Sequence, residues 1–363
     1  MSSPTLSFSP SDIPDLTGKV ALVTGANVGI GFETAYFLAS HNATVYLACR
    51  SESRALSAID ILQSRLKAAK VDAKLYYHNL DLGSIKTAKS SADDFLTKET
   101  RLDILIANAG VLGNQWTPEW EYEPMFYTNH LGHFAFVTTL LPLIEKTASL
   151  THDVRIVCTT SKALTMTSPT IDYNSITERP KDADEPRHIG QFATSMKVYG
   201  QGKLANLYFA KELDRRYREK GVWVNAPHPG WVGGTELGLH EAFDMFGFIT
   251  KRIVNFLHNW VAMKTADGMR PRTFDLYVLL LKDEGMVLMQ KLCLGAATQT
   301  YLATSPHVPE YGIHGQYLMP RKNWLWRYQG PQVVNLGAPY QNEEEWSKLW
   351  QWSEEVVKKE LAK

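Results

Sequence analysis

The feature that most constrains the fold of this chain is a regular alternation of short apolar strands and helical segments over its first 240 residues. Strands are expected at residues 19–23, 44–49, 74–78, 102–107, 155–159 and 222–226, and helices at 32–40, 54–70, 134–146 and 203–216. Strands that alternate with helices form βαβ units, so this order predicts a parallel sheet with helices on both faces. The predicted fold class is α/β with a doubly wound parallel sheet of the Rossmann type.

The whole chain, residues 1–363, is predicted to form a single domain. We expect a loose arm rich in Ser and Pro over the first 17 residues. The expected parts after the arm are a core at 17–240, an apolar insert at 240–292, a last helix–strand unit at 293–335 and a C-terminal helix at 340–363. In the tail, Asn342 can cap that helix and three Glu follow it, which suits the positive end of the helix dipole.

Composition excludes several classes of protein. Lys and Arg number 38, and so do Asp and Glu, so a nucleic-acid partner is not expected. No apolar run reaches the roughly 18 residues of a membrane-spanning helix. The first residues lack the pattern of a secretory signal, which predicts a cytoplasmic protein. The three cysteines, Cys49, Cys158 and Cys293, have no metal-ligand spacing, and neither do the His residues, so no metal site is expected.

A glycine-rich loop follows the first expected strand. It reads Thr24-Gly25-Ala26-Asn27-Val28-Gly29-Ile30-Gly31. Gly25 permits a tight turn, Gly29 removes a side chain where a pyrophosphate would pass, and Gly31 lets the next helix approach the sheet. That helix offers free N–H groups to a phosphate. The loop therefore predicts a dinucleotide site that includes Asn27, Val28 and Ile30.

The end of the second strand predicts which dinucleotide is bound. An acidic residue at this position would hold a ribose 2′-hydroxyl, but the chain has Arg50 followed by Ser51, with Arg54 nearby. Arg can hold a 2′-phosphate through two bonds, so NADP(H) is the expected cofactor. Asp81 and Leu82 follow the third strand and are expected to meet the adenine, although Asp81 could equally cap a helix.

These motifs occur together with others in an order that resembles the short-chain dehydrogenase/reductase family. The further motifs are Asn108-Ala109-Gly110, Asn129, Ser161, Tyr199-xxx-Lys203 and Pro229-Gly230. The strings TGANVGIGFETA, LACR, NHLGHF, YGQGKLAN, HPG and YLATSP resemble the branch that holds retinol dehydrogenases and the WW-domain oxidoreductase. The resemblance spans roughly residues 17–320 and concerns the dehydrogenase part only, without WW domains.

The spacing of Tyr199 and Lys203 carries chemistry of its own. Residues four apart share one face of a helix, and an ammonium near a phenol is expected to lower the pKa of the phenol toward working pH. Such a phenol can give a proton to a carbonyl oxygen or take one from an alcohol. Ser161 ends the fifth strand and can hydrogen-bond the same oxygen.

The resemblance implies further roles. Asn129 matches the residue that completes the proton relay, and Lys203 matches one that also binds the nicotinamide ribose. Asn108, Ala109 and Gly110 would leave room for the adenosine ribose, and Pro229 and Gly230 would meet the nicotinamide. Val232 and Thr235 complete the implied cofactor set, with Thr235 on the phosphates.

The expected partner is a bulky hydrophobic small molecule. Three stretches could build its pocket: 111–125 with Trp116 and Trp120, the excursion at 162–195, and Trp231 onward into the insert. The insert could form a lid, a dimer face or a membrane contact, and a homo-oligomer remains open. We expect carbonyl–alcohol interconversion, with a tailoring step in secondary-metabolite biosynthesis as one setting. The alternatives are a C=C (enone) reductase and a non-catalytic NADP(H)-binding regulatory protein.

Overall fold

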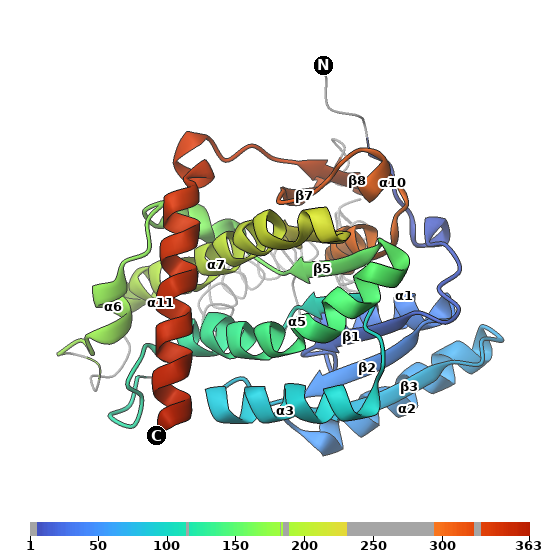
Figure 1. Cartoon of the computed structure of the whole chain (residues 1–363), viewed down its shortest axis with the longest axis horizontal. Coiled ribbons are helices and arrows are strands. Elements are labelled where there is room, and N and C mark those ends of the chain that lie inside the picture. Colours follow the sequence, from blue (N-terminus) through green and yellow to red (C-terminus); the bar gives the residue numbers. More distant parts are fainter. Residues whose placement is uncertain (1–5, 114–115, 182, 184–188, 231–293, 323–327) are drawn as a thin grey trace, which may run out of the picture.

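The computed structural model describes residues 6–363 apart from 114–115, 182, 184–188, 231–293 and 323–327. Within these residues an eight-stranded sheet has the order β3-β2-β1-β4-β5-β6-β7-β8 (Figure 1). β1 to β7 run parallel, and β8 is antiparallel to β7. The strands are β1 (Val20–Thr24), β2 (Thr44–Cys49), β3 (Lys74–Asn79), β4 (Ile104–Ala107), β5 (Val154–Cys158), β6 (Val222–Pro227), β7 (Tyr317–Lys322) and β8 (Tyr328–Val333). The predicted fold class is confirmed.

Helices cover both faces of the sheet, as the strands require. Every residue of β1, β4 and β5 is buried, so neither face of these strands can meet water. On one face lie α3 (Ile85–Lys98), α5 (Gly132–Thr151) and α7 (Ile189–Tyr217). On the other lie α1 (Gly29–Ser40), α2 (Glu52–Ala68) and a helical segment at 294–304.

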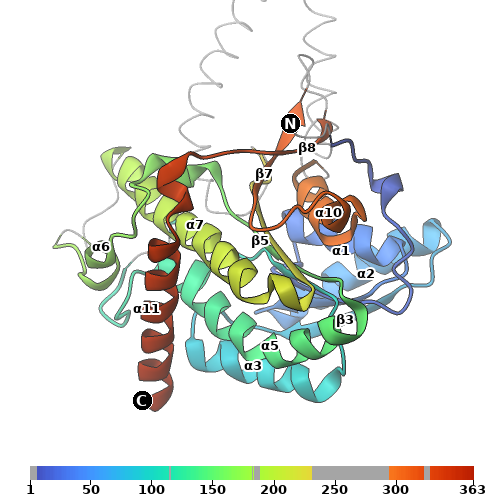
Figure 2. The same cartoon turned by 45° about the horizontal axis from the view of Figure 1, so that its top comes forward.

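The C-terminal helix that the sequence predicts is α11 (Glu343–Ala362). The side chain of Asn342 caps it by accepting a hydrogen bond from the backbone of Glu344 at 3.1 Å. The helix packs across α7 and α3 (Figures 1 and 2). Trp346, Leu349 and Trp350 are buried in this contact, so the helix belongs to the core on the α7 face.

One expectation needs correction. The N-terminal arm is not loose where the structure describes it, because Leu6, Phe8 and Leu16 are buried against the face that carries α1. The Phe8 ring meets the Tyr301 ring edge-on at 5.4 Å. The last unit contains a helical segment at 294–304 and the strand β7, with α10 (His307–Glu310) between them and β8 after them.

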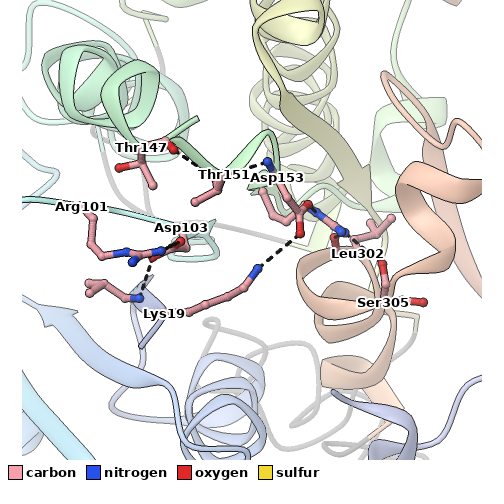
Figure 3. Close-up of polar contacts among 10 residues, drawn as sticks. Lys19, Arg101, Asp103, Thr147, Thr151, Asp153, Leu302 and Ser305 are labelled. Carbon is pink, nitrogen blue, oxygen red and sulfur yellow. Dashed lines mark hydrogen bonds and ion pairs between the residues drawn. The ribbon is translucent and has the colours of Figure 1, made fainter. Parts of the chain in front are cut away.

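A network of polar side chains lies at the amino ends of the strands (Figure 3). Arg155 of β5 is 2% exposed and donates to the carbonyls of Leu302 and Ser305 at 3.2 and 3.1 Å. It also pairs with Asp153, which Lys19 approaches at 3.3 Å. The network joins β5 to the helical segment at 294–304. It lies at the amino ends of the strands, opposite their carboxyl ends.

Candidate active site

A cleft of about 710 Å³ opens at the carboxyl ends of the parallel strands. It brings together most of the residues that the sequence singles out. The predicted residues that line it are Gly25, Asn27, Val28, Gly29, Ile30, Arg50, Ser51, Asp81, Leu82, Asn108, Ala109, Gly110, Ser161, Tyr199, Lys203, Pro229 and Gly230. Gly31 and Asn129 are not among the residues that line the cleft. Val232, Thr235 and the 240–292 insert fall outside the described residues.

The glycine loop has the shape that the sequence predicts. Gly25 and Gly29 have φ angles of +65° and +63°, which favour glycine. A Cβ on Gly31 would lie 2.5 Å from the Gly25 carbonyl, so a side chain there would push α1 away from the loop. The amino end of α1, which begins at Gly29, therefore faces the cleft with its free N–H groups and can receive a phosphate.

Arg50 and its neighbours form the rim of the cleft at the end of β2. Arg50 is exposed, and Ser51 caps α2 by accepting from the backbone of Arg54 at 3.4 Å. Asp81 does not cap α3, because Ser84 does. The Asp81 carboxylate instead accepts from the backbone of Gly83 at 2.9 Å. The rim thus places the side chains of Arg50 and Arg54 on the same cleft as the turn that follows β3.

The segment Asn108–Val111, after β4, forms the wall between the loop and the catalytic side chains. Thr24 Oγ1 accepts hydrogen bonds from the backbone N–H groups of Asn108 and Ala109, both at 2.9 Å. A Cβ on Gly110 would lie 3.2 Å from Asn129 Oδ1 and 3.3 Å from Lys203 Nζ. Glycine at this position lets the catalytic side chains reach the wall.

Asn129 lies in a π-helical turn, Tyr127–Leu131, between the short α4 (Pro124–Phe126) and α5. Such turns are frequent at functional sites. The Asn129 side chain is fully buried and makes two hydrogen bonds with Val111: it accepts from the backbone N–H at 2.7 Å and donates to the carbonyl at 3.0 Å. Asn129 therefore holds the wall segment in place.

Ser161, Tyr199 and Lys203 meet at the centre of the cleft. Tyr199 and Lys203 lie one turn apart on α7, with Lys203 Nζ 5.5 Å from the centre of the Tyr199 ring. Lys203 Nζ also donates to the carbonyl of Thr159 at 3.2 Å. Ser161 hydrogen-bonds the Tyr199 hydroxyl. Ser161 and Tyr199 can both hydrogen-bond one oxygen atom of a bound substrate, with the charge of Lys203 nearby.

Burial sets the protonation of this centre. It raises the pKa of Tyr199, and the hydrogen bond from Ser161 opposes this only in part. Burial also lowers the pKa of Lys203 to about 8. The expected lowering of the Tyr199 pKa by Lys203 is therefore wrong for this structure, because desolvation of the phenolate dominates and the opposing interaction comes from Ser161. Tyr199 keeps its proton at neutral pH and can donate it.

The end of the cleft beside Tyr199 is apolar. Its described lining residues include Val111, Leu112, Ala163, Met166 and Met196. The prediction that segments 111–125 and 162–195 contribute to the pocket is confirmed, but the residues that line it differ from those singled out. Trp116 and Trp120 do not line the cleft: Trp116 is buried and donates from Nε1 to the Trp120 carbonyl at 2.8 Å, and the Trp120 ring packs on Tyr127 at 5.3 Å.

Two residues near the site were not identified as functional from the sequence. Thr24 stands directly before Gly25, and His133 stands four residues after Asn129 in the string NHLGHF. The spacing in that string was the available signal.

Among the described residues there is no cluster of His, Cys, Asp or Glu that could hold a metal ion. Cys49 and Cys158 are buried free thiols. No described helix has the length and apolar character needed to cross a membrane.

The comparisons with known proteins agree with this geometry. The model of the short chain dehydrogenase family matches residues 19–173. A short-chain dehydrogenase/reductase of Armillaria gallica is 32% identical over 356 residues, which cover 98% of this chain and 95% of that one. Human retinol dehydrogenase 13 is 36% identical over 261 residues, 71% of this chain and 72% of that one. WW domain-containing oxidoreductases are among the other relatives, so the resemblance is confirmed.

A solved structure shares the fold over nearly the whole chain. It is that of a putative uncharacterized protein from Mycobacterium paratuberculosis, with a TM-score of 0.63 and 22% identity. The match covers 97% of this chain and 98% of that one.

Proposed function

Because the chain belongs to the short-chain dehydrogenase/reductase family, we propose that it is an NADP(H)-dependent oxidoreductase that interconverts a carbonyl and an alcohol on a bulky hydrophobic small molecule. The observation that carries the proposal is the meeting of Ser161, Tyr199 and Lys203 in the cleft that the glycine loop opens. We propose a tailoring step of small-molecule biosynthesis as its setting.

The residues present fit a nicotinamide dinucleotide. A Cβ on Gly25 would press on Ala109 and one on Gly110 would press on Asn129 and Lys203, so glycine keeps the cleft wall close, and the amino end of α1 suits a pyrophosphate. The exposed Arg50 at the rim supports a preference for the 2′-phosphate. A bound nicotinamide would supply or accept the hydride, and Lys203 stands on the wall at Gly110 where it could bind the ribose.

The protein's own part in reduction is a proton transfer. Tyr199 holds its proton at neutral pH and gives it to the carbonyl oxygen as the carbon is reduced. Ser161 hydrogen-bonds that oxygen and then the phenolate that remains. The charge of Lys203 stabilises the phenolate until a proton returns.

The apolar end of the cleft supports the substrate class. Val111, Leu112 and the two methionines offer little hydrogen bonding, so affinity would come from burial of apolar surface. Methionine side chains adapt to irregular shapes, which suits a bulky ring system.

The test is oxidation of NADPH with a panel of bulky apolar ketones, aldehydes and enones, with NADH as the comparison and identification of the products. Alcohol products formed with NADPH would support the proposal. Saturated ketones from the enones would replace it with C=C reduction. Tight NADPH binding without any turnover would favour a regulatory binding protein.

A further inference from the structure

His133 joins two parts of the site that lie on different elements. It stands in the first turn of α5 and is 2% exposed. Its Nδ1 lies 3.1 Å from the backbone carbonyl oxygen of Asn129, and its Nε2 lies 3.0 Å from Thr24 Oγ1 at the end of β1. One buried ring therefore touches both the π-turn and the strand that leads into the glycine loop.

The partners of Thr24 fix the direction of these bonds. Thr24 Oγ1 already accepts two hydrogen bonds, from the backbone of Asn108 and Ala109. A hydroxyl has two lone pairs and one hydrogen, so Thr24 donates its hydrogen to His133 Nε2. Nε2 is then the unprotonated nitrogen, and Nδ1 carries the hydrogen that it donates to the Asn129 carbonyl. A neutral ring in one tautomer satisfies every contact.

The two ends of this chain of bonds hold the same segment. Thr24 fixes its beginning at Asn108 and Ala109, and the Asn129 side chain fixes its end at Val111 through two hydrogen bonds. Between them lies Gly110, which has Asn129 Oδ1 and Lys203 Nζ as neighbours. A shift of Thr24 relative to Asn129 would therefore change the wall of the cleft beside Lys203.

We propose that His133 is a positioning residue, whose neutral ring, protonated on Nδ1, ties the Asn129 carbonyl to the Thr24 hydroxyl and so keeps the wall segment 108–111 in register with Lys203. The effect on catalysis rests on the proposed function, since it acts through the cofactor cleft. The tautomer does not rest on it.

The surroundings keep the ring neutral. Burial lowers the pKa of His133 to about 4, the bond to Asn129 opposes this, and the charge of Lys203 on α7 adds to the lowering. His130, on the π-turn, is another titratable group that faces it, and burial lowers the pKa of His130 to about 3. An imidazolium would bring a second donor against the Thr24 hydroxyl. The tautomer is accordingly constant over the pH range of an assay.

The first test reads the tautomer directly, by ¹⁵N NMR of protein labelled at histidine between pH 5.5 and 8. The His133 signals are assigned by their loss in His133→Phe. We expect a protonated Nδ1 and an unprotonated Nε2 that do not titrate. A protonated Nε2, or a titration near 6.5, overturns the proposal. This result is independent of whether the protein turns over any substrate.

The second test is a double-mutant cycle of His133→Phe and Thr24→Val, read as the Kd for NADPH and as kcat. We expect each single variant to weaken NADPH binding about tenfold and to lower kcat at saturating NADPH. The double variant should be no worse than the worse single one, because the two residues act through one chain of bonds. Additive losses, or a His133→Phe protein within twofold of the wild type in both constants, overturn the proposal.

His78→Phe is the matched control. His78 is also a buried histidine with a hydrogen-bonded ring, to Ser91, but it lies between β3 and α3 and is not among the residues that line the cleft. We expect His78→Phe to leave the Kd and kcat within twofold. If His133→Phe does not fold, His133→Gln replaces it in the cycle, and the tautomer measurement, assigned by that variant, still decides. If the wild type binds neither dinucleotide, the proposed function fails while the tautomer test stands.

Discussion

Ser353 of the C-terminal helix is hydrogen-bonded to His130 of the π-turn, with Oγ and Nε2 2.9 Å apart. Both side chains are fully buried, and His130 directly follows Asn129 in the chain. The ring of Trp352 adds an edge-on contact to Phe126, at 6.0 Å. A helix more than 200 residues away in the sequence thus supports the turn that carries a catalytic candidate.

Ser353→Ala should therefore weaken both stability and catalysis. It leaves a buried imidazole nitrogen without its partner, which costs about 1–3 kcal/mol. Urea unfolding measures this cost, and kcat at saturating NADPH should fall because the π-turn is held less firmly. Ser347→Ala, on the same helix, is the control. Ser347 Oγ accepts a solvent-exposed hydrogen bond from Arg215 Nη2 at 3.4 Å. Equal effects of the two variants would refute the coupling.

Affinity for NADPH should depend on pH through Lys203. Burial lowers the pKa of Lys203 to about 8, so its charge is complete well below that value and is lost as the pH rises through it. If binding needs the charged form, affinity is full well below pH 8, is falling at pH 8, and approaches a loss of about tenfold per pH unit above it. Isothermal titration between pH 6.5 and 9.5 measures the trend.

Lys203→Arg should abolish this decline, because Arg stays protonated. Lys211→Arg is the control: burial also lowers the pKa of Lys211 to about 8, but its Nζ donates to the Gly315 carbonyl, away from the cleft. A decline that persists in Lys203→Arg and disappears in Lys211→Arg would show that the wrong lysine was chosen.

Arg50→Asp should reverse the cofactor preference. A charged hydrogen bond to the 2′-phosphate contributes about 1.5–3 kcal/mol, so its loss should raise the KM for NADPH roughly 10- to 100-fold. The KM for NADH should stay the same or fall. Lys67→Asp, an exposed site near the far end of α2, makes the same change of charge and should alter neither constant. A wild-type protein that prefers NADH would make our assignment of Arg50 wrong.

Arg155→Met tests the polar network at the amino ends of the strands (Figure 3). The substitution leaves the carbonyls of Leu302 and Ser305 without their donor and Asp153 without its nearest cation. A buried carbonyl left without its donor costs about 1–3 kcal/mol, so we expect at least this loss of stability, measured by urea unfolding. The exposed Lys89–Asp93 pair is the comparison, and Lys89→Met should change stability by less than about 0.5 kcal/mol. A small cost for Arg155→Met would mean that the network adds little.

Much of the fold was predictable because the strands are short, apolar and regularly spaced. The six strands expected over the first 240 residues are present as β1 to β6, with ends that differ by a few residues. α3 was not predicted, since most of its buried residues are small: Ala88, Ser91 and Ala92 are buried together with only two large apolar residues, Ile85 and Phe95. The arm was expected to be loose from its Ser and Pro content, which does not reveal that its few apolar side chains find a partner in Tyr301.

The site was predictable at positions where backbone or spacing is diagnostic. Gly25 and Gly29 stand out because few other residues adopt their φ angles, and Tyr199 and Lys203 because of their helical spacing. The raised pKa of Tyr199 was not predictable, because it comes from burial of the side chain, which the four-residue spacing to Lys203 does not reveal. The role that we infer for His133 depends on three elements meeting, which no local pattern encodes.

The central claim is that Tyr199 supplies the proton in carbonyl reduction, and Tyr199→Phe tests it most directly. The measurement is kcat for NADPH-dependent reduction of the best ketone in the panel, together with the Kd for NADPH. We predict that kcat falls by about 10²- to 10⁴-fold while the Kd stays within twofold, because the phenol acts on the substrate oxygen and not on binding of the dinucleotide. A Tyr199→Phe protein that keeps its kcat would contradict the account.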